Sequence, residues 1–89
     1  MNLRQLFLQH VAQTSPAPLA IEIVKAEGCE LIDAAGKKYL DLIGGISVAN
    51  VGHRHPRVVK AIKKQTDDYL HVMVYGEFVQ SPQVQYARL

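Results

Sequence analysis

The stretch LAIEIVKAEGCELIDAAGKKYLDLIGG, residues 19–45, has the pattern of three short strands joined by two turns. Apolar and β-branched side chains alternate with polar ones, with turn residues between the runs. DAAG at 33–36 carries Asp first and Gly fourth, which is typical of a type I turn, and Glu27-Gly28 supplies the other turn. The sequence therefore predicts a three-stranded antiparallel meander that ends at Gly44-Gly45, with strands over 21–26, 29–32 and 37–43.

Helices are expected on both sides of this meander. An apolar stripe at helical spacing, with Asn2 as N-cap, predicts a helix from Leu3 to about Val11. Pro56 suits the first turn of a second helix, which carries an apolar face to about residue 70. Ser81-Pro82 reads as the N-cap and first turn of a last helix. The predicted fold class is α+β: an N-terminal helix, the meander, then helices.

Composition bounds the class of protein. The chain has 89 residues, is 48% hydrophobic and carries a net charge of +2, which suits one small folded domain or part of a larger one. Cys29 is the only cysteine, so neither an intrachain disulfide nor a Cys-based zinc cage can form. The N-terminus lacks the apolar core of a signal peptide, and no window is apolar enough to span a membrane. We therefore expect a soluble cytoplasmic protein.

The last helix also bears on completeness. It has a well-formed start at Ser81 but runs for only two turns, and isolated helices that short are marginal in water. We therefore expect the 89 residues to be a fragment of a longer chain, with exposed apolar faces that would contact the missing part.

The segment GHRHP, residues 52–56, is the first candidate site. His53 and His55 are two apart and would point the same way on an extended backbone. A metal site needs further ligands, and the spacing requires none of the possible ones. The favoured interpretation is structural, with one imidazole bonding near the helix start and the other partly exposed. The possible further ligands are His10, His71, Cys29 and Asp41.

Other constellations are weaker. The basic face of the helix after Pro56 lacks interleaved aromatic residues, which favours a solvated face over a nucleic-acid site. Neither phosphate-loop motif is present, so Gly44 and Gly45 form either a simple turn or a place where a ligand or backbone approaches closely. No serine or cysteine has the context of a catalytic nucleophile. Composition and spacing alone therefore support only one conclusion, that the chain is part of a soluble α+β domain.

The whole segment GCELIDAAGKKYLDLIGGISVANVGHRHPRVVKAIKKQ, residues 28–65, resembles the N-terminal part of class III pyridoxal-phosphate-dependent aminotransferases. Those enzymes carry a hairpin of the type G..L.D..G..YLDF followed by..G.(A/S)V...GH.HP.VV.AI..Q. The matching positions are Gly28, Leu31, Asp33, Gly36, Tyr39, Leu40, Asp41, Gly45, Ser47, Val48, Asn50, Gly52, His53, His55, Pro56, Val58, Val59, Ala61 and Ile62.

The resemblance implies a fold-type I enzyme, usually dimeric, in which this segment belongs to the small domain beside the substrate entrance. It implies that the loop after the third strand lines the substrate pocket, with four substrate-binding residues, Gly44, Gly45, Ile46 and Ser47. Glycines leave room for the substrate, and Ile46 takes the position that varies with the substrate's side chain. On this reading the histidines close a turn that positions the loop and perform no chemistry.

The same resemblance implies the complete enzyme's reaction: transfer of an amino group from an ω- or α-amino donor, such as acetylornithine, ornithine or 4-aminobutyrate, to a 2-oxo acid. The cofactor would be pyridoxal 5'-phosphate (PLP), held by a lysine that the family carries far downstream. We therefore expect no catalytic, cofactor-binding or metal-binding residue in 1–89, and no activity of this chain alone. Its partners would be the remainder of its subunit, a second subunit of a homodimer, and the substrates.

Two departures from the family pattern and two alternatives remain open. HVMVYGEFVQSPQ, residues 71–83, does not follow the HTSN.YYN.PQ of the acetylornithine branch, which leaves the substrate and any role of Tyr75 open; Arg54 stands where many members have Cys. The first alternative is a stand-alone module that self-associates through its first helix and the apolar 72–79 segment. The second is a His-based metal-binding module.

Overall fold

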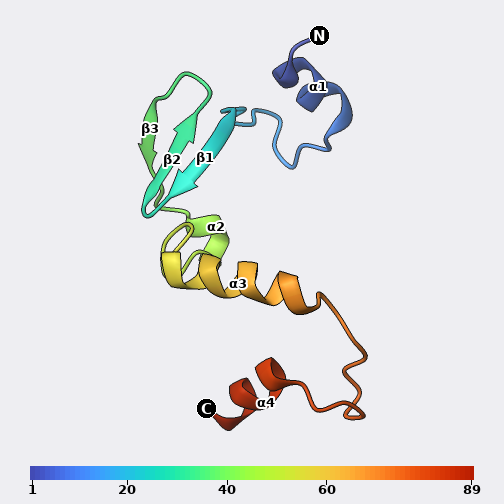
Figure 1. Ribbon diagram of the computed structural model, residues 1–89. Coiled ribbons are helices and arrows are strands. Elements are labelled where there is room, and N and C mark those ends of the chain that lie inside the picture. Colours follow the sequence, from blue (N-terminus) through green and yellow to red (C-terminus); the bar gives the residue numbers. More distant parts are fainter. The chain divides into compact units, whose positions relative to one another are not determined.

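The strands predicted between residues 19 and 45 are present in a computed structural model, which describes all of residues 1–89. They are β1 (Ile23–Glu27), β2 (Glu30–Asp33) and β3 (Lys38–Leu40). The three form one antiparallel sheet in the order β1-β2-β3 (Figure 1). The meander is confirmed, and with the helices on either side of it the fold is α+β.

The turn between β2 and β3 is built around one carboxylate. Gly36 N–H donates to the Asp33 carbonyl at 2.9 Å, which is the hydrogen bond expected of the predicted turn. Oδ1 of Asp33 also accepts from the backbone N–H groups of Ala35 (3.0 Å) and Lys37 (2.9 Å). Its Oδ2 accepts from the Tyr39 hydroxyl at 2.9 Å. The side chain that starts the turn therefore also fixes its exit into β3.

This network shifts the acidity of both side chains in opposite directions. Donation from the Lys37 amide, assisted by the Tyr39 hydroxyl, holds the pKa of Asp33 below its ordinary value. The hydrogen bond to the Asp33 carboxylate raises the pKa of Tyr39 above 10.0, because ionising the phenol would remove the donor and set two negative charges side by side. The Lys37 ammonium lies 5.0 Å from the centre of the Tyr39 ring.

The predicted end of the third strand is wrong. β3 ends at Leu40 rather than at Ile43, so residues 41–43 lie outside the sheet. The cause is local: the Asp41 side chain accepts hydrogen bonds from the backbone two and three residues ahead, which turns the chain out of the strand. The first turn is also displaced, because β1 extends through Glu27.

Residues 1–56 form one compact unit, which contains the sheet and helix α1 (Leu3–His10). Asn2 caps α1 as predicted, and the cap is reciprocal. The Asn2 side chain accepts from the Gln5 N–H at 2.9 Å, and the Gln5 side chain accepts from the Asn2 N–H at 2.9 Å. Two of the donors that every helix start leaves unpaired are satisfied in this way.

Residues 57–89 form the second unit. It contains most of α3 (Pro56–Asp68), which begins at the predicted proline, and all of α4 (Ser81–Arg88). The prediction that Ser81 caps α4 is wrong: Gln80 occupies the N-cap position with an extended backbone, and no side chain bonds the helix start. None of the helices combines the length and the apolar character that crossing a bilayer requires.

Neither unit has a hydrophobic core. No residue is buried, although nearly half of the sequence is hydrophobic. Leu42, Ile46, Leu70 and Val79 are each more than four-fifths exposed. Local hydrogen bonds, rather than packed side chains, therefore determine the conformation of the loops in this structure.

Candidate functional site

The four residues singled out as substrate-binding form a single tight turn, labelled α2 (Gly44–Ser47) in Figure 1. All four have a positive φ: 59° at Gly44, 63° at Gly45, 61° at Ile46 and 65° at Ser47. Glycine adopts this left-handed region freely, but it costs a residue with a Cβ about 1–2 kcal/mol. For a β-branched residue such as Ile46 a positive φ is a conformational outlier. The turn is therefore strained at its second half.

The turn is closed by its own backbone. The Gly44 carbonyl accepts from the N–H groups of Val48 at 3.0 Å and Ala49 at 2.9 Å, and the Ile43 carbonyl accepts from the Ile46 N–H at 3.1 Å. A Cβ on Gly45 would lie 3.4 Å from the Val48 Cβ, so the glycine faces the inside of the turn. Ile46 is 82% exposed, and it therefore projects from the turn as an apolar group open to solvent.

Asp41 organises the entrance of the turn. Its Oδ1 accepts from the N–H groups of Ile43 and Gly44, both at 3.0 Å. Its Oδ2 lies 2.5 Å from Nε2 of His53. The Asp41 side chain is only 5% exposed and that of His53 20%, which makes this pair far more enclosed than the ion pairs Lys25–Glu27 and Lys38–Glu30. The hydrogen bond from His53, with those from the two amides, holds the pKa of Asp41 below its ordinary value.

His53 is in turn fixed to the sheet by its backbone. Gly28 N–H donates to the His53 carbonyl at 2.9 Å, and His53 N–H donates to the Gly28 carbonyl at 2.8 Å, which forms an antiparallel bridge. Gly28 lies in the turn between β1 and β2. The bridge and the side-chain contact together connect the first hairpin, the end of β3 and the entrance of α2 through one histidine.

The two histidines do not share an extended segment. Arg54 between them has a φ of 54°, so the backbone bends at the position where the sequence pattern would have aligned their side chains. His53 meets one carboxylate, that of Asp41, and no group of three His, Cys, Asp or Glu side chains in the chain is arranged to hold a metal ion.

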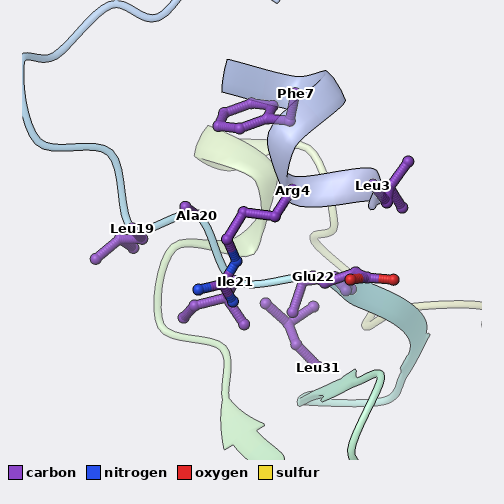
Figure 2. Close-up of a pocket in the computed structure, with 9 residues that line it drawn as sticks. Leu3, Arg4, Phe7, Leu19, Ala20, Ile21, Glu22 and Leu31 are labelled. Atoms are coloured by element: carbon purple, nitrogen blue, oxygen red, sulfur yellow. The ribbon is translucent and has the colours of Figure 1, made fainter. Parts of the chain in front are cut away.

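An apolar groove of about 390 Å³ lies elsewhere in the first unit, between α1 and the segment that leads into β1. Figure 2 shows Arg4 reaching from α1 toward Ile21 at this groove. Its only ionisable side chains are Arg4 and Glu22, so it offers no constellation for catalysis. Its apolar walls are Leu3, Phe7, Leu19, Ile21, Ile23 and Leu31.

Sequence reasoning missed the role of Asp41, which it assigned to the third strand and weighed only as a metal ligand. A signal was present. An aspartate three residues before a glycine pair is the pattern of a side chain that accepts from the backbone just ahead of it. Its contact with His53, twelve residues away, has no such local signature.

The chain is similar to proteins of one family. A family model described as aminotransferase class-III matches residues 11–89. An acetylornithine aminotransferase from Methanocaldococcus jannaschii is 53% identical over 53 residues, which cover 60% of this chain and 13% of that protein. A probable 4-aminobutyrate aminotransferase from Bacillus subtilis is 43% identical over 61 residues, which cover 64% of this chain and 14% of that protein.

The structural comparison agrees. The solved taurine:2-oxoglutarate aminotransferase from Bifidobacterium kashiwanohense, in complex with PLP and glutamate, superposes with a TM-score of 0.79 at 29% identity. The match covers 93% of this chain and 19% of that one. The chain thus spans less than a fifth of the length of each of these proteins.

Proposed function

Because the chain belongs to the class III aminotransferase family, we propose that it is the N-terminal part of a PLP-dependent aminotransferase subunit, in which the turn Gly44–Ser47 forms one wall of the substrate pocket. The complete cytoplasmic enzyme transfers an amino group from an ω- or α-amino donor to a 2-oxo acid. Acetylornithine and 4-aminobutyrate are candidate donors, since the relatives named for them match this chain.

The observation that carries the role of the turn is its strain. Ile46 and Ser47 hold left-handed conformations that cost free energy and that no buried packing compensates. Strained backbone of this kind concentrates at functional sites. Glycines at the first two positions leave space beside the backbone, while Ile46 presents an exposed aliphatic surface. Such a wall suits the methylene chain of an ω-amino donor.

The residues of this chain do not by themselves fit PLP. The group needs a lysine in an enclosed pocket, an acid against its ring nitrogen and donors around its phosphate. The six lysines are all exposed, and the carboxylate of Asp41 is already occupied by His53 and two amides. We therefore assign the cofactor lysine to a part of the subunit outside residues 1–89, and we expect the chain alone to be inactive. The lysines are Lys25, Lys37, Lys38, Lys60, Lys63 and Lys64.

The exposed apolar side chains support the proposed partners. Large hydrophobic residues are open to solvent on α1, on the sheet and throughout the 70–79 segment. Faces of this kind are normally covered in a folded enzyme. We assign them to contacts with the remainder of the subunit and with the second subunit of a homodimer.

A chimera tests the proposal. Residues 11–89 replace the matching segment of the M. jannaschii acetylornithine aminotransferase, and the scaffold with that segment deleted serves as the control. We expect the chimera to bind PLP and to transfer the amino group of acetylornithine to a 2-oxo acid, while the deleted scaffold does neither. A chimera that folds and binds PLP but has no aminotransferase activity would contradict the proposal.

A further inference from the structure

We propose that Asp41 and His53 act as a latch that fixes the position of the turn Gly44–Ser47 relative to the sheet, which makes both of them positioning residues for the substrate wall. That the turn is a wall rests on the proposed function. The claim that the latch holds the turn is independent of the proposed function, because it is argued only from the contacts of these residues.

The turn needs an external constraint. Two of its residues, Ile46 and Ser47, lie in a region that an unrestrained chain rarely occupies, so the turn would relax if nothing held it. Packing supplies no such constraint, because no residue of the chain is buried and α2 does not pack against any strand. What remains is hydrogen bonding. Three backbone hydrogen bonds close the turn on itself, and the side chain that bonds its entrance is the Asp41 carboxylate.

Both oxygens of that carboxylate are used, each for a different purpose. Oδ1 binds the N–H groups of Ile43 and Gly44 and so fixes the direction in which the chain enters the left-handed region. Oδ2 binds Nε2 of His53 at 2.5 Å and so fixes the carboxylate itself. Hydrogen bonds to a charged group are about twice as strong as neutral ones, and this pair is largely shielded from water.

The histidine carries the constraint to a rigid element. Its backbone is bridged in both directions to Gly28, in the turn of the first hairpin, so the base of its side chain is held in place while the contact with Asp41 orients the ring. The position of Ile46 relative to the sheet is therefore set by a chain of three links. It runs from Gly28 to the His53 backbone, from the imidazole to Asp41, and from Asp41 into the turn.

Asp33 provides a matched control within the same unit. It too accepts from two backbone N–H groups through Oδ1 and from one side chain through Oδ2, but it serves the turn between β2 and β3. Deleting its carboxylate removes the same chemistry at a different turn. A general loss of stability would follow from either deletion, whereas loss of the latch follows only from changing Asp41 or His53.

The test is nuclear magnetic resonance of the full 89-residue chain. A residue with φ near +60° gives a strong intraresidue amide-to-Hα Overhauser effect, because those two protons lie unusually close. We expect strong effects at Ile46 and Ser47 in the wild type and in Asp33→Ala, and their loss in Asp41→Ala and His53→Ala. His53→Gln should restore them in part, since the Gln amide can donate to Asp41 as the imidazole does. In every variant that loses them, cross-strand contacts between Leu31 and Tyr39 should persist.

The latch is overturned if the wild type lacks these effects, if Asp41→Ala keeps them, if Asp33→Ala loses them equally, or if the cross-strand contacts disappear together with the turn. These outcomes are separate from the fate of the proposed function. An inactive chimera whose isolated chain shows the expected spectra refutes the substrate wall and leaves the latch standing. An active chimera whose isolated chain lacks the expected Overhauser effects refutes the latch and leaves the proposed function standing.

Discussion

Gly52 lies so close to Gly28 that a Cβ on Gly52 would be 3.3 Å from the Gly28 carbonyl oxygen. The approach is close because the residue after Gly52 is His53, whose N–H donates to that same oxygen at 2.8 Å. Gly52 and His53 therefore have two linked structural roles. The glycine lets the backbones meet, and the histidine bonds across the meeting point and carries the contact on to Asp41.

Replacing Gly52 with alanine should weaken the bridge between Gly28 and His53. Gly36 is the matched control, because its φ of 83° is nearly that of Gly52 at 85° but a Cβ there meets nothing within 4 Å. Both Gly→Ala changes introduce backbone strain, and only Gly52→Ala adds steric overlap, so it should cost about 1 kcal/mol more. Amide hydrogen exchange at His53 measures this. Equal exchange rates in the two variants would show that the close approach has no energetic consequence.

The latch should open in acid. The folded-state pKa of Asp41 is lowered below 3.8, so its stabilising contribution is fully present above that value and is lost as the pH falls through the lower, folded-state value. The amide resonances of Ile43 and Gly44, followed from neutral pH downward, should therefore stay constant to about pH 4 and shift below it. In Asp41→Asn this acid transition should disappear. If Asp41→Asn shows an acid transition of the same size, the transition in the wild type arises from another titrating group.

In the turn between β2 and β3 the pKa of Tyr39 is raised, whereas that of Asp41 is lowered, and the effect is observed at alkaline pH. The Asp33 carboxylate raises the pKa of Tyr39 above 10.0, so the phenol should ionise later than a free tyrosine. Asp33→Asn removes the negative charge and should bring that pKa back toward 10.0, which an absorbance titration compared with Tyr39→Phe would resolve. An unchanged titration in Asp33→Asn would mean that the hydrogen bond between the two side chains is not formed in solution.

The isolated chain should self-associate. Large apolar side chains are exposed on every helix and on strands β1 and β3, and burying apolar surface is the main favourable term in association. We expect light scattering to show a mass that rises with concentration, and an apolar dye to fluoresce on binding. A monodisperse monomer that binds no dye would contradict the assignment of these faces to partner contacts.

The regular elements of this fold could be predicted because their signals are local. DAAG carries its turn in its own residues, and the Pro56 helix carries its start and its apolar face. The end of β3 could not be predicted, because YLDLI has the propensity of a strand and is overruled by two hydrogen bonds to the Asp41 side chain. The four residues of the proposed substrate wall were named only through the family resemblance. The contact between Asp41 and His53, to which we assign the positioning of that turn, joins residues twelve apart, and no local pattern contains it.

The central claim, that Gly44–Ser47 forms a wall of a substrate pocket, is tested most directly by steady-state kinetics of the chimera carrying Ile46→Trp. Val24→Trp, at an exposed position on β1, is the control. Our account predicts that Ile46→Trp raises the KM for the amino donor at least about tenfold with PLP binding unchanged, and that Val24→Trp leaves the KM as it was. A KM that does not respond to Ile46→Trp, or that responds equally to Val24→Trp, would contradict it.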